Sequence, residues 1–169
     1  MIVVSDATPL ITLMKADKLE ILNKLFGDVL IPEAVFTELT ANKRFNKEAE
    51  LIKKSKYIKV VKVGAVSQVT LLRRATGLDL GESEAIIYAD ENKADLLLVD
   101  EAAGRRVAQN MNLSIAGSVG ILVRAFKDGF IAVEEAEDVF DKIKSSNRHI
   151  SEKLIDDALD IIHRAANES

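Results

Sequence analysis

The chain has 169 residues, which suits one compact domain better than two. With 48% hydrophobic and 30% charged residues, the sequence is too apolar for intrinsic disorder. It contains no Cys and only two His, which excludes disulfides, thiolate zinc sites and Cys nucleophiles, so carboxylates must carry any metal chemistry. The N-terminus has no basic n-region and no apolar run is long enough to span a bilayer. We therefore expect a cytoplasmic protein with no membrane partner.

Basic residues are concentrated in one stretch of an otherwise acidic chain. The net charge is −4, yet residues 43–74 contain ten basic residues against Glu48 and Glu50, a local charge of +8. The ten are Lys43, Arg44, Lys47, Lys53, Lys54, Lys56, Lys59, Lys62, Arg73 and Arg74. A local positive surface can attract phosphate groups while the remainder keeps the protein soluble. The stretch indicates nucleic-acid binding or, alternatively, a merely solvated basic helix.

Short β-branched runs alternate with helical periods, which predicts βα units on a mainly parallel sheet with helices on both faces. We expect strands at residues 2–4, 29–31, 58–63, 96–99 and 114–116, with helices filling the gaps. Thr8 before Pro9 predicts a cap and a first helical turn, and Pro32 can occupy another first helical position. Later helices are expected at residues 80–92, 102–110, 119–127, 133–145 and 151–166.

Two of the predicted strands end in an aspartate, Asp6 and Asp100. Because the carboxyl ends of parallel strands share one edge, where open α/β sheets bind ligands, we expect both side chains at that edge. An Asp at a strand end can instead cap the following helix, and for Asp100 this alternative is equally open. For Asp6 it is weaker, because Thr8 is the better placed cap. Asp6 is therefore predicted to be functional.

Three glutamates on predicted helices are further candidates. Glu38 borders the apolar stripe of the helix after Pro32, where a carboxylate is costly unless a cation or donors meet it; rotation toward solvent is the open alternative. Glu82 follows Asp79 at the spacing of a capping box, which gives it a local structural role. Glu84 has no such role, so it is preferred for the site and Glu82 is kept in reserve.

The preferred candidates share an acidic side chain and come from two strand ends and two helices: Asp6, Glu38, Glu84 and Asp100. Such a group repels itself, and hard oxygen ligands of this kind suit Mg²⁺ or Mn²⁺, which would neutralise the repulsion. These residue types favour metal-assisted hydrolysis of a phosphoester over a nucleophilic mechanism.

Four segments, residues 5–10, 32–39, 81–86 and 97–101, follow one another in the order found in PIN domains. The chain resembles the prokaryotic PIN-like proteins akin to VapC-type toxin ribonucleases over about residues 1–131, including the segment 117–120. The resemblance implies a three-layer α/β/α fold with a mainly parallel central sheet. Residues 1–131 would form the PIN-like nuclease domain and residues 132–169 a C-terminal helical extension of the same domain, packed alongside.

The same resemblance implies a divalent-metal-dependent ribonuclease, with Asp6, Glu38 and Glu84 at the family's acidic positions and either Asp100 or Glu101 as the fourth. These acids would hold Mg²⁺ or Mn²⁺ and activate water for attack on an RNA phosphodiester, while basic residues grip the backbone. The expected partners are the RNA substrate, an antitoxin protein docked on the apolar C-terminal helices, and a second copy in a homodimer. The alternative is a non-catalytic nucleic-acid-binding or protein-interaction module on the same fold.

Overall fold

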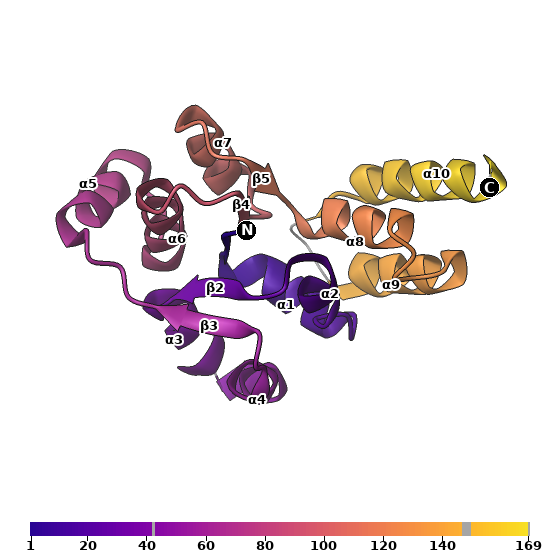
Figure 1. The fold of residues 1–169 in the computed structure, drawn as a ribbon, viewed down its shortest axis with the longest axis horizontal. Helices are drawn as coiled ribbons and strands as arrows, with labels where there is room; N and C mark the ends of the chain where they lie inside the picture. Colours follow the sequence, from indigo (N-terminus) through magenta and orange to yellow (C-terminus); the bar gives the residue numbers. More distant parts are fainter. Residues whose placement is uncertain (42, 147–149, 169) are drawn as a thin grey trace.

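A computed structural model describes residues 1–41, 43–146 and 150–168. Within these residues the centre of the fold is a parallel five-stranded sheet in the order β3-β2-β1-β4-β5 (Figure 1). The strands are β1 (Val3–Ser5), β2 (Val29–Pro32), β3 (Ile58–Val61), β4 (Leu96–Leu98) and β5 (Ile115–Ala116). The predicted parallel α/β architecture is confirmed, and each strand lies within two residues of its expected position.

The helices fill the gaps between the strands, as expected. They are α1 (Ala7–Lys15), α2 (Ile21–Phe26), α3 (Glu33–Ala41), α4 (Asn46–Lys54), α5 (Val66–Thr76), α6 (Leu80–Glu91), α7 (Ala102–Asn110), α8 (Ser118–Lys127), α9 (Val133–Ser146) and α10 (Glu152–Glu168), with a 3-10 turn, η1 (Lys43–Phe45). The prediction that Thr8 caps α1 is wrong, because Asp6 is the N-cap and Thr8 lies inside the first turn. In the described ranges, no helix is long and apolar enough to cross a membrane.

Helices cover both faces of the sheet, and the alternation of side chains along the strands shows which helices cover which face. Val3 and Leu98 point into a core shared with α1, α8, α9 and α10. Their neighbours Val4 and Leu97 point the opposite way, into a core shared with α6 and α7. Parallel strands buried on both faces read as continuous apolar runs, which is why these strands stood out in the sequence. The result is a three-layer fold.

The chain changes direction across the sheet at β1. It runs from β1 outward through β2 to β3, and then returns to the other side of β1 to form β4 and β5. Ser5 pairs with Leu98, and the Asp6 amide donates to the Leu98 carbonyl at 3.0 Å. Ligands of open parallel sheets bind in the crevice outside the carboxyl ends where strand order reverses. In this fold that crevice lies between the ends of β1 and β4.

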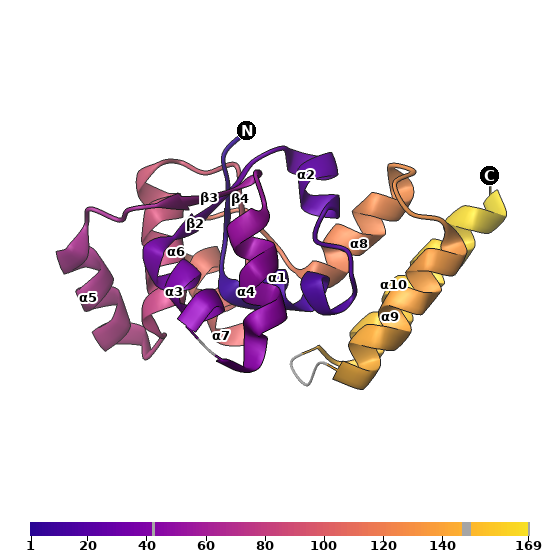
Figure 2. The same ribbon diagram turned by 90° about the horizontal axis from the view of Figure 1, so that it is seen from below.

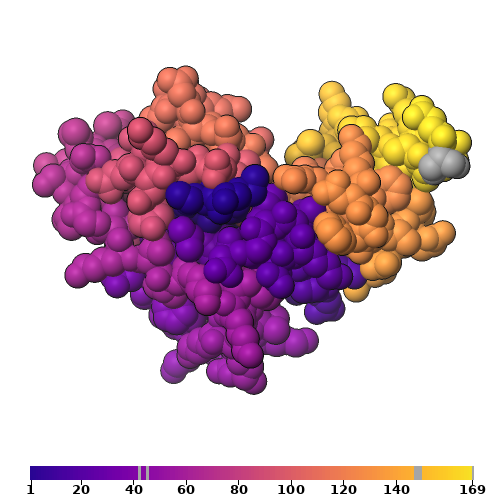
Figure 3. Space-filling view, in the orientation of Figure 1, coloured from indigo at the N-terminus to yellow at the C-terminus, as the bar shows by residue number. Residues whose placement is uncertain are grey.

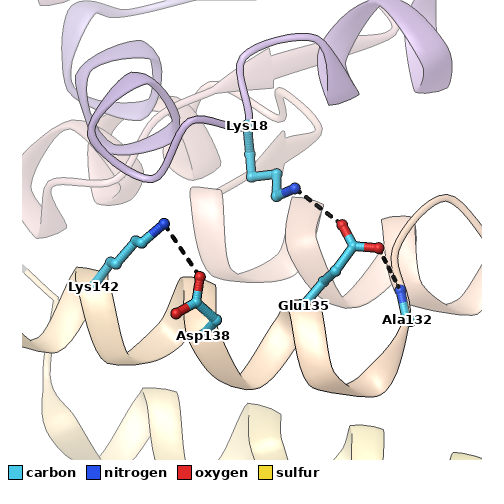
Figure 4. Close-up of polar contacts among 5 residues, drawn as sticks. All are labelled: Lys18, Ala132, Glu135, Asp138 and Lys142. Carbon is cyan, nitrogen blue, oxygen red and sulfur yellow. Dashed lines mark hydrogen bonds and ion pairs between the residues drawn. The ribbon is translucent and has the colours of Figure 1, made fainter.

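The C-terminal helices α9 and α10 form a hairpin that packs on α8, and α9 also contacts α1 (Figures 1 and 2). Its apolar stripe is buried, and Phe140, Ile155 and Ile162 are fully enclosed. Around this stripe, Lys18 Nζ contacts Glu135 Oε2 at 3.0 Å (Figure 4). Half-exposed ion pairs of this kind contribute at most about 1 kcal/mol, so apolar burial holds the hairpin in place.

If the hairpin belongs to the same cooperative unit as the sheet, truncating its core will destabilise the whole protein. Phe140→Ala removes a side chain that is 0% exposed, and we expect a loss of about 3–5 kcal/mol in the free energy of unfolding. Urea unfolding followed by circular dichroism should show one transition at a lower midpoint. Phe130→Ala, at a position 39% exposed, is the control and should change stability by less than about 1 kcal/mol. Two separate transitions in Phe140→Ala would show that the hairpin folds independently.

Candidate active site

The carboxylate of Asp6 lies at the crevice between β1 and β4. Asp6 follows β1 directly and is only 3% exposed, although its side chain makes no capping hydrogen bond to α1. Burial raises the pKa of Asp6 well above its usual value, and the Ala7 N–H opposes that effect in part. The negative charges of Glu82, Asp79 and Glu38 raise the pKa further. Asp6 is therefore a desolvated acid surrounded by other acids.

The first turn of α6 supplies two of these neighbours through the capping box that the sequence predicts. Asp79 Oδ1 accepts from the Glu82 amide at 2.8 Å, and Glu82 Oε2 accepts from the Asp79 amide at 3.1 Å. This reciprocal cap uses only one oxygen of Glu82. The other, Oε1, is buried and has no hydrogen-bond partner among the described residues. A buried carboxylate oxygen without a donor is costly, which is typical of a functional position.

Glu101, the residue after Asp100, faces Glu82 from the end of β4. Its Oε1 accepts a hydrogen bond from Thr8 Oγ1 at 3.2 Å, so α1 holds the carboxylate in place. Burial raises the pKa of Glu82 to about 7, and the negative charges of Asp79 and Glu101 add to this effect. When Glu82 and Glu101 are both ionised, neither can donate a hydrogen bond, whereas a proton on either one can bridge them.

Glu38 reaches the same region from α3, across a close contact between α3 and α6. A Cβ atom on Gly81 would lie 3.2 Å from Glu38 Oε2, so glycine at this position lets the two helices approach. Partial burial raises the pKa of Glu38, as do the charges of Asp79 and Glu101. Together these side chains form the acidic cluster, defined as Asp6, Glu38, Asp79, Glu82 and Glu101. A hollow of about 360 Å³ opens beside it, lined by Glu38, Asp79 and Gly81 among others.

Glu84, the preferred candidate on α6, has a structural partner on α3. Its Oε2 accepts a hydrogen bond from the Ala34 amide at 3.1 Å, in the first turn of α3. This contact satisfies one of the amides that a helix N-terminus leaves unpaired, and the negative charge suits that end of the helix. Glu84 thus has a structural partner fifty residues away in sequence, while Glu82, kept in reserve, lies in the cluster.

Asp100 is likewise engaged outside the acidic cluster. Its two oxygens accept from the amide and from the hydroxyl of Ser118, both at 2.7 Å, at the start of α8. The capping alternative for Asp100 therefore describes this geometry, although the helix that it caps is α8 and not the adjacent α7. Of the two acids considered for the fourth position, Glu101 is the one whose negative charge acts on Glu82 and Glu38. Its position directly after Asp100 was the only signal for it in the sequence.

A clamp around Asp100 fixes the backbone that carries Glu101. Arg105 Nη1 donates to the Val99 carbonyl at 2.9 Å, just before Asp100. A Cβ atom on Gly117 would lie 2.8 Å from Asp100 Oδ1 and 3.0 Å from Arg105 Nη1. Only glycine leaves room for both groups, so Gly117 is part of the clamp.

The chemistry of the acidic cluster fits a hard divalent cation, although its spacing is looser than a formed metal site. In the described part of the chain, no three His or acidic side chains are grouped closely enough to hold a metal ion. All donors in the cluster are oxygens, the ligands that Mg²⁺ and Mn²⁺ prefer. Glu82 Oε1 is a buried oxygen without a donor, and no cluster member forms an ion pair with a described Lys, Arg or His. A cation would supply the missing partner if the side chains moved closer together.

The fold and the site define a class: a parallel α/β domain with buried carboxylates at the point where its strand order reverses. A family model described as a PIN domain matches residues 2–164, and the chain belongs to the PIN-domain family. Searches of curated proteins and of solved structures give no match to the chain. The family match confirms the resemblance found in the sequence and extends it through most of α10. It also identifies the fold as one used by nucleases.

The raised pKa of Glu82 predicts how stability depends on pH. A carboxyl group that holds its proton more tightly in the folded state stabilises the fold at low pH, and this stabilisation is lost as pH rises through about 7. In metal-free buffer the melting temperature should therefore fall between about pH 5 and pH 8. Glu82→Gln should flatten this dependence, while Glu91→Gln, at an exposed position on the same helix, should keep it. An equally steep profile in Glu82→Gln would rule out Glu82 as its source.

The clamp around Asp100 predicts that Gly117 tolerates no side chain. Gly117→Ala should lower the free energy of unfolding by about 1–3 kcal/mol, because the new methyl group displaces Asp100 from Ser118 and leaves buried polar groups unpaired. Thermal unfolding measures the effect. Gly120→Ala is the matched control on α8, because a Cβ atom there meets nothing within 4 Å, and it should leave stability unchanged or raise it slightly. Equal stability of the two variants would contradict the clamp.

Proposed function

We propose that the chain is a divalent-metal-dependent ribonuclease whose active site is the acidic cluster. The supporting observation is the burial of two carboxylates at one crevice, with three more acids beside them and no ion pair to a described basic residue. Asp6 is 3% exposed and Glu82 is 6% exposed, and burial raises the pKa of both. Maintaining such a group is costly unless a cation binds to it.

Asp6, Glu38, Glu82 and Glu101 would hold the cation, while Asp79 orients Glu82 through the capping box. When bound, Mg²⁺ or Mn²⁺ would lower the pKa of a coordinated water and neutralise charge on the phosphate. Thr8 holds Glu101 by its hydrogen bond, so this carboxylate is kept in position for the cation. Because Glu82 has a pKa of about 7, cation binding near neutral pH should release a proton from it.

The basic residues of the stretch 43–74 support RNA as the substrate. Lys53 and Lys54 lie on the last turn of α4, and Lys59 and Lys62 lie on or just after the edge strand β3. All four side chains are exposed. Exposed basic groups bind phosphates without reading base sequence and do so more weakly as salt rises. They would hold an RNA strand along the side of the sheet next to the acidic cluster.

A toxin role and a homodimer are two further proposals that follow from the family resemblance. A toxin role would require an antitoxin partner, and a homodimer would require a second copy on an apolar face. A groove of about 530 Å³ between α8 and α10 offers such a face, with Leu154 and Ile161 exposed along it. Figure 3 shows the C-terminal helices standing apart from α7 across a notch. The non-catalytic alternative predicts RNA binding that survives chelation without any cleavage.

Two glutamates on α6, two positions apart in sequence and therefore about 200° apart around the helix axis, give the sharpest test of the active site. Glu82→Gln should lower Mn²⁺-dependent cleavage of a defined RNA by at least about 100-fold, as should Asp6→Asn, because each removes a cation-binding charge. Glu84→Gln should lower cleavage by no more than a few fold, because Glu84 accepts the Ala34 amide of α3 and a glutamine oxygen can do the same. Cleavage rates are measured across a titration of Mg²⁺ and Mn²⁺, with thermal shifts of each variant as the readout of cation binding.

The reverse order of effects would favour the sequence-based choice of Glu84. Cleavage that is unchanged in Asp6→Asn, or that persists in excess chelator, would refute the metal-dependent mechanism. Wild-type protein that binds RNA but never cleaves it, with any divalent cation, would favour the non-catalytic alternative.

A further inference from the structure

A second hollow, of opposite charge, lies next to the acidic one. It measures about 470 Å³ and is lined by Thr70, Arg73, Arg74, Gly77 and Leu78, at the end of α5 and the turn that leads into α6. In Figure 1 these two helices lie side by side at the end of the molecule opposite α10. We call it the arginine hollow.

The two guanidinium groups of the arginine hollow have no partner among the residues that the structure describes. Arg73 and Arg74 are exposed, and neither side chain forms an ion pair or hydrogen bond with any described residue. The sequence contains no acidic residue between Glu50 and Asp79, so no nearby carboxylate on the same segment can neutralise them. Thr70 Oγ1 already donates to the Val66 carbonyl at 3.0 Å, which leaves the arginines as the donors.

Two arginines elsewhere in the fold, Arg105 and Arg124, have structural contacts that Arg73 and Arg74 lack. Arg105 holds the Val99 carbonyl, and Arg124 pairs with Asp128 at 3.6 Å and stacks 5.3 Å above the ring of Phe26. A guanidinium group presents a planar fork of donors that matches phosphate oxygens. Adjacent unpaired arginines repel each other, and an anion bound between them relieves this repulsion.

The arginine hollow and the acidic hollow share one short turn. Gly77 ends α5 in the left-handed conformation with φ 77°, and its amide donates to the Arg73 carbonyl at 2.8 Å. Leu78 is buried, and Asp79 then caps α6. Gly77 lines the arginine hollow and Asp79 lines the acidic hollow. Because one residue separates them, their Cα atoms are at most about 7 Å apart.

We infer that the arginine hollow is a subsite for a backbone phosphate of the RNA strand, next to the phosphate that is cut at the acidic cluster. The inference rests on the proposed nuclease function and adds to it the path of the substrate. An approaching RNA strand is repelled by bare carboxylates, and two guanidinium groups beside them offset this repulsion. Held at Arg73 and Arg74, the strand crosses the turn at residues 77–79 and reaches the acids with a fixed register.

The test measures RNA binding without catalysis. Full-length protein is titrated into a labelled single-stranded RNA of about 12 nucleotides in chelator, and the dissociation constant is followed by fluorescence anisotropy over a range of salt. Loss of two phosphate contacts should reduce the slope of log K against log salt by about 1.4, since each contact to a single strand contributes about 0.7. We expect Arg73→Ala/Arg74→Ala to bind at least about 10-fold more weakly at low salt and to show this reduced slope.

Two further double variants serve as matched controls. Lys153→Ala/Arg164→Ala removes the same charge from the exposed surface of α10 and should bind as the wild type does. Arg73→Lys/Arg74→Lys keeps the positive charge but loses the planar guanidinium donors. It should therefore keep the wild-type slope of log K against log salt but recover only part of the affinity for RNA. Melting temperatures of all variants should match, because none of these side chains has an ion pair or hydrogen bond with a described residue.

The outcomes separate the subsite from the nuclease function. Wild-type affinity in Arg73→Ala/Arg74→Ala, or an equal loss in Lys153→Ala/Arg164→Ala, overturns the subsite even if metal-dependent cleavage is present. Failure of the wild-type protein to bind RNA overturns it as well. A selective loss of binding in the first variant, in a protein that never cleaves RNA, upholds the phosphate site and refutes the nuclease.

Discussion

The burial of the Asp6 carboxylate at the end of β1 is the constraint on which the rest of the site depends. The short strand ends at the centre of the sheet, next to the end of β4, because the chain returns across β1 after completing β3. Backbone pairing to β4 fixes Asp6 at the start of α1, where the residue is only 3% exposed. Burial alone raises its pKa, and each further acid at the crevice adds a repulsive charge. The fold must therefore fix the neighbouring acids against their mutual repulsion.

The carboxylates around the crevice divide by what their oxygens accept. Those of Asp79, Glu84 and Asp100 accept backbone amides at the N-termini of α6, α3 and α8. These contacts stabilise helix ends, and they position the elements that carry the acids left without such partners. Glu82 does both, since one oxygen belongs to the capping box and the other is free at the crevice. A side chain anchored at one atom and unpaired at the other can bind a ligand with little loss of conformational entropy, which is the geometry that a functional carboxylate requires.

The architecture could be predicted from the sequence because helices cover both faces of the sheet, so that each strand is a continuous apolar run. Since the strands are parallel, their carboxyl ends could also be expected at one edge of the sheet. Prediction from the sequence failed where tertiary contacts decide. Thr8 was expected to cap α1, but the helix begins before Thr8, at Ala7. Proline can occupy any position in the first turn of a helix, because the amides there have no partner, so Pro9 did not fix where α1 begins. The capping box was predicted correctly, yet the spacing could not show that Glu82 keeps one oxygen free. Nor could it show that Glu84 meets the start of α3, because that contact joins residues fifty positions apart.

The electrostatics of the chain follow from the same topology. Although the net charge is −4, residues 51–78 carry seven basic residues and no acid. This basic segment leads directly into the acidic first turn of α6. The sign of the charge thus changes within the few residues that join α5 to α6. A polyanion can lie across such a boundary, bound on the basic side and brought to the acids on the other, whereas either surface alone would hold only the strand or only a cation. The left-handed turn at Gly77 joins the two surfaces, and in the proposed nuclease it would couple the place where the strand is held to the place where its phosphodiester meets the carboxylates.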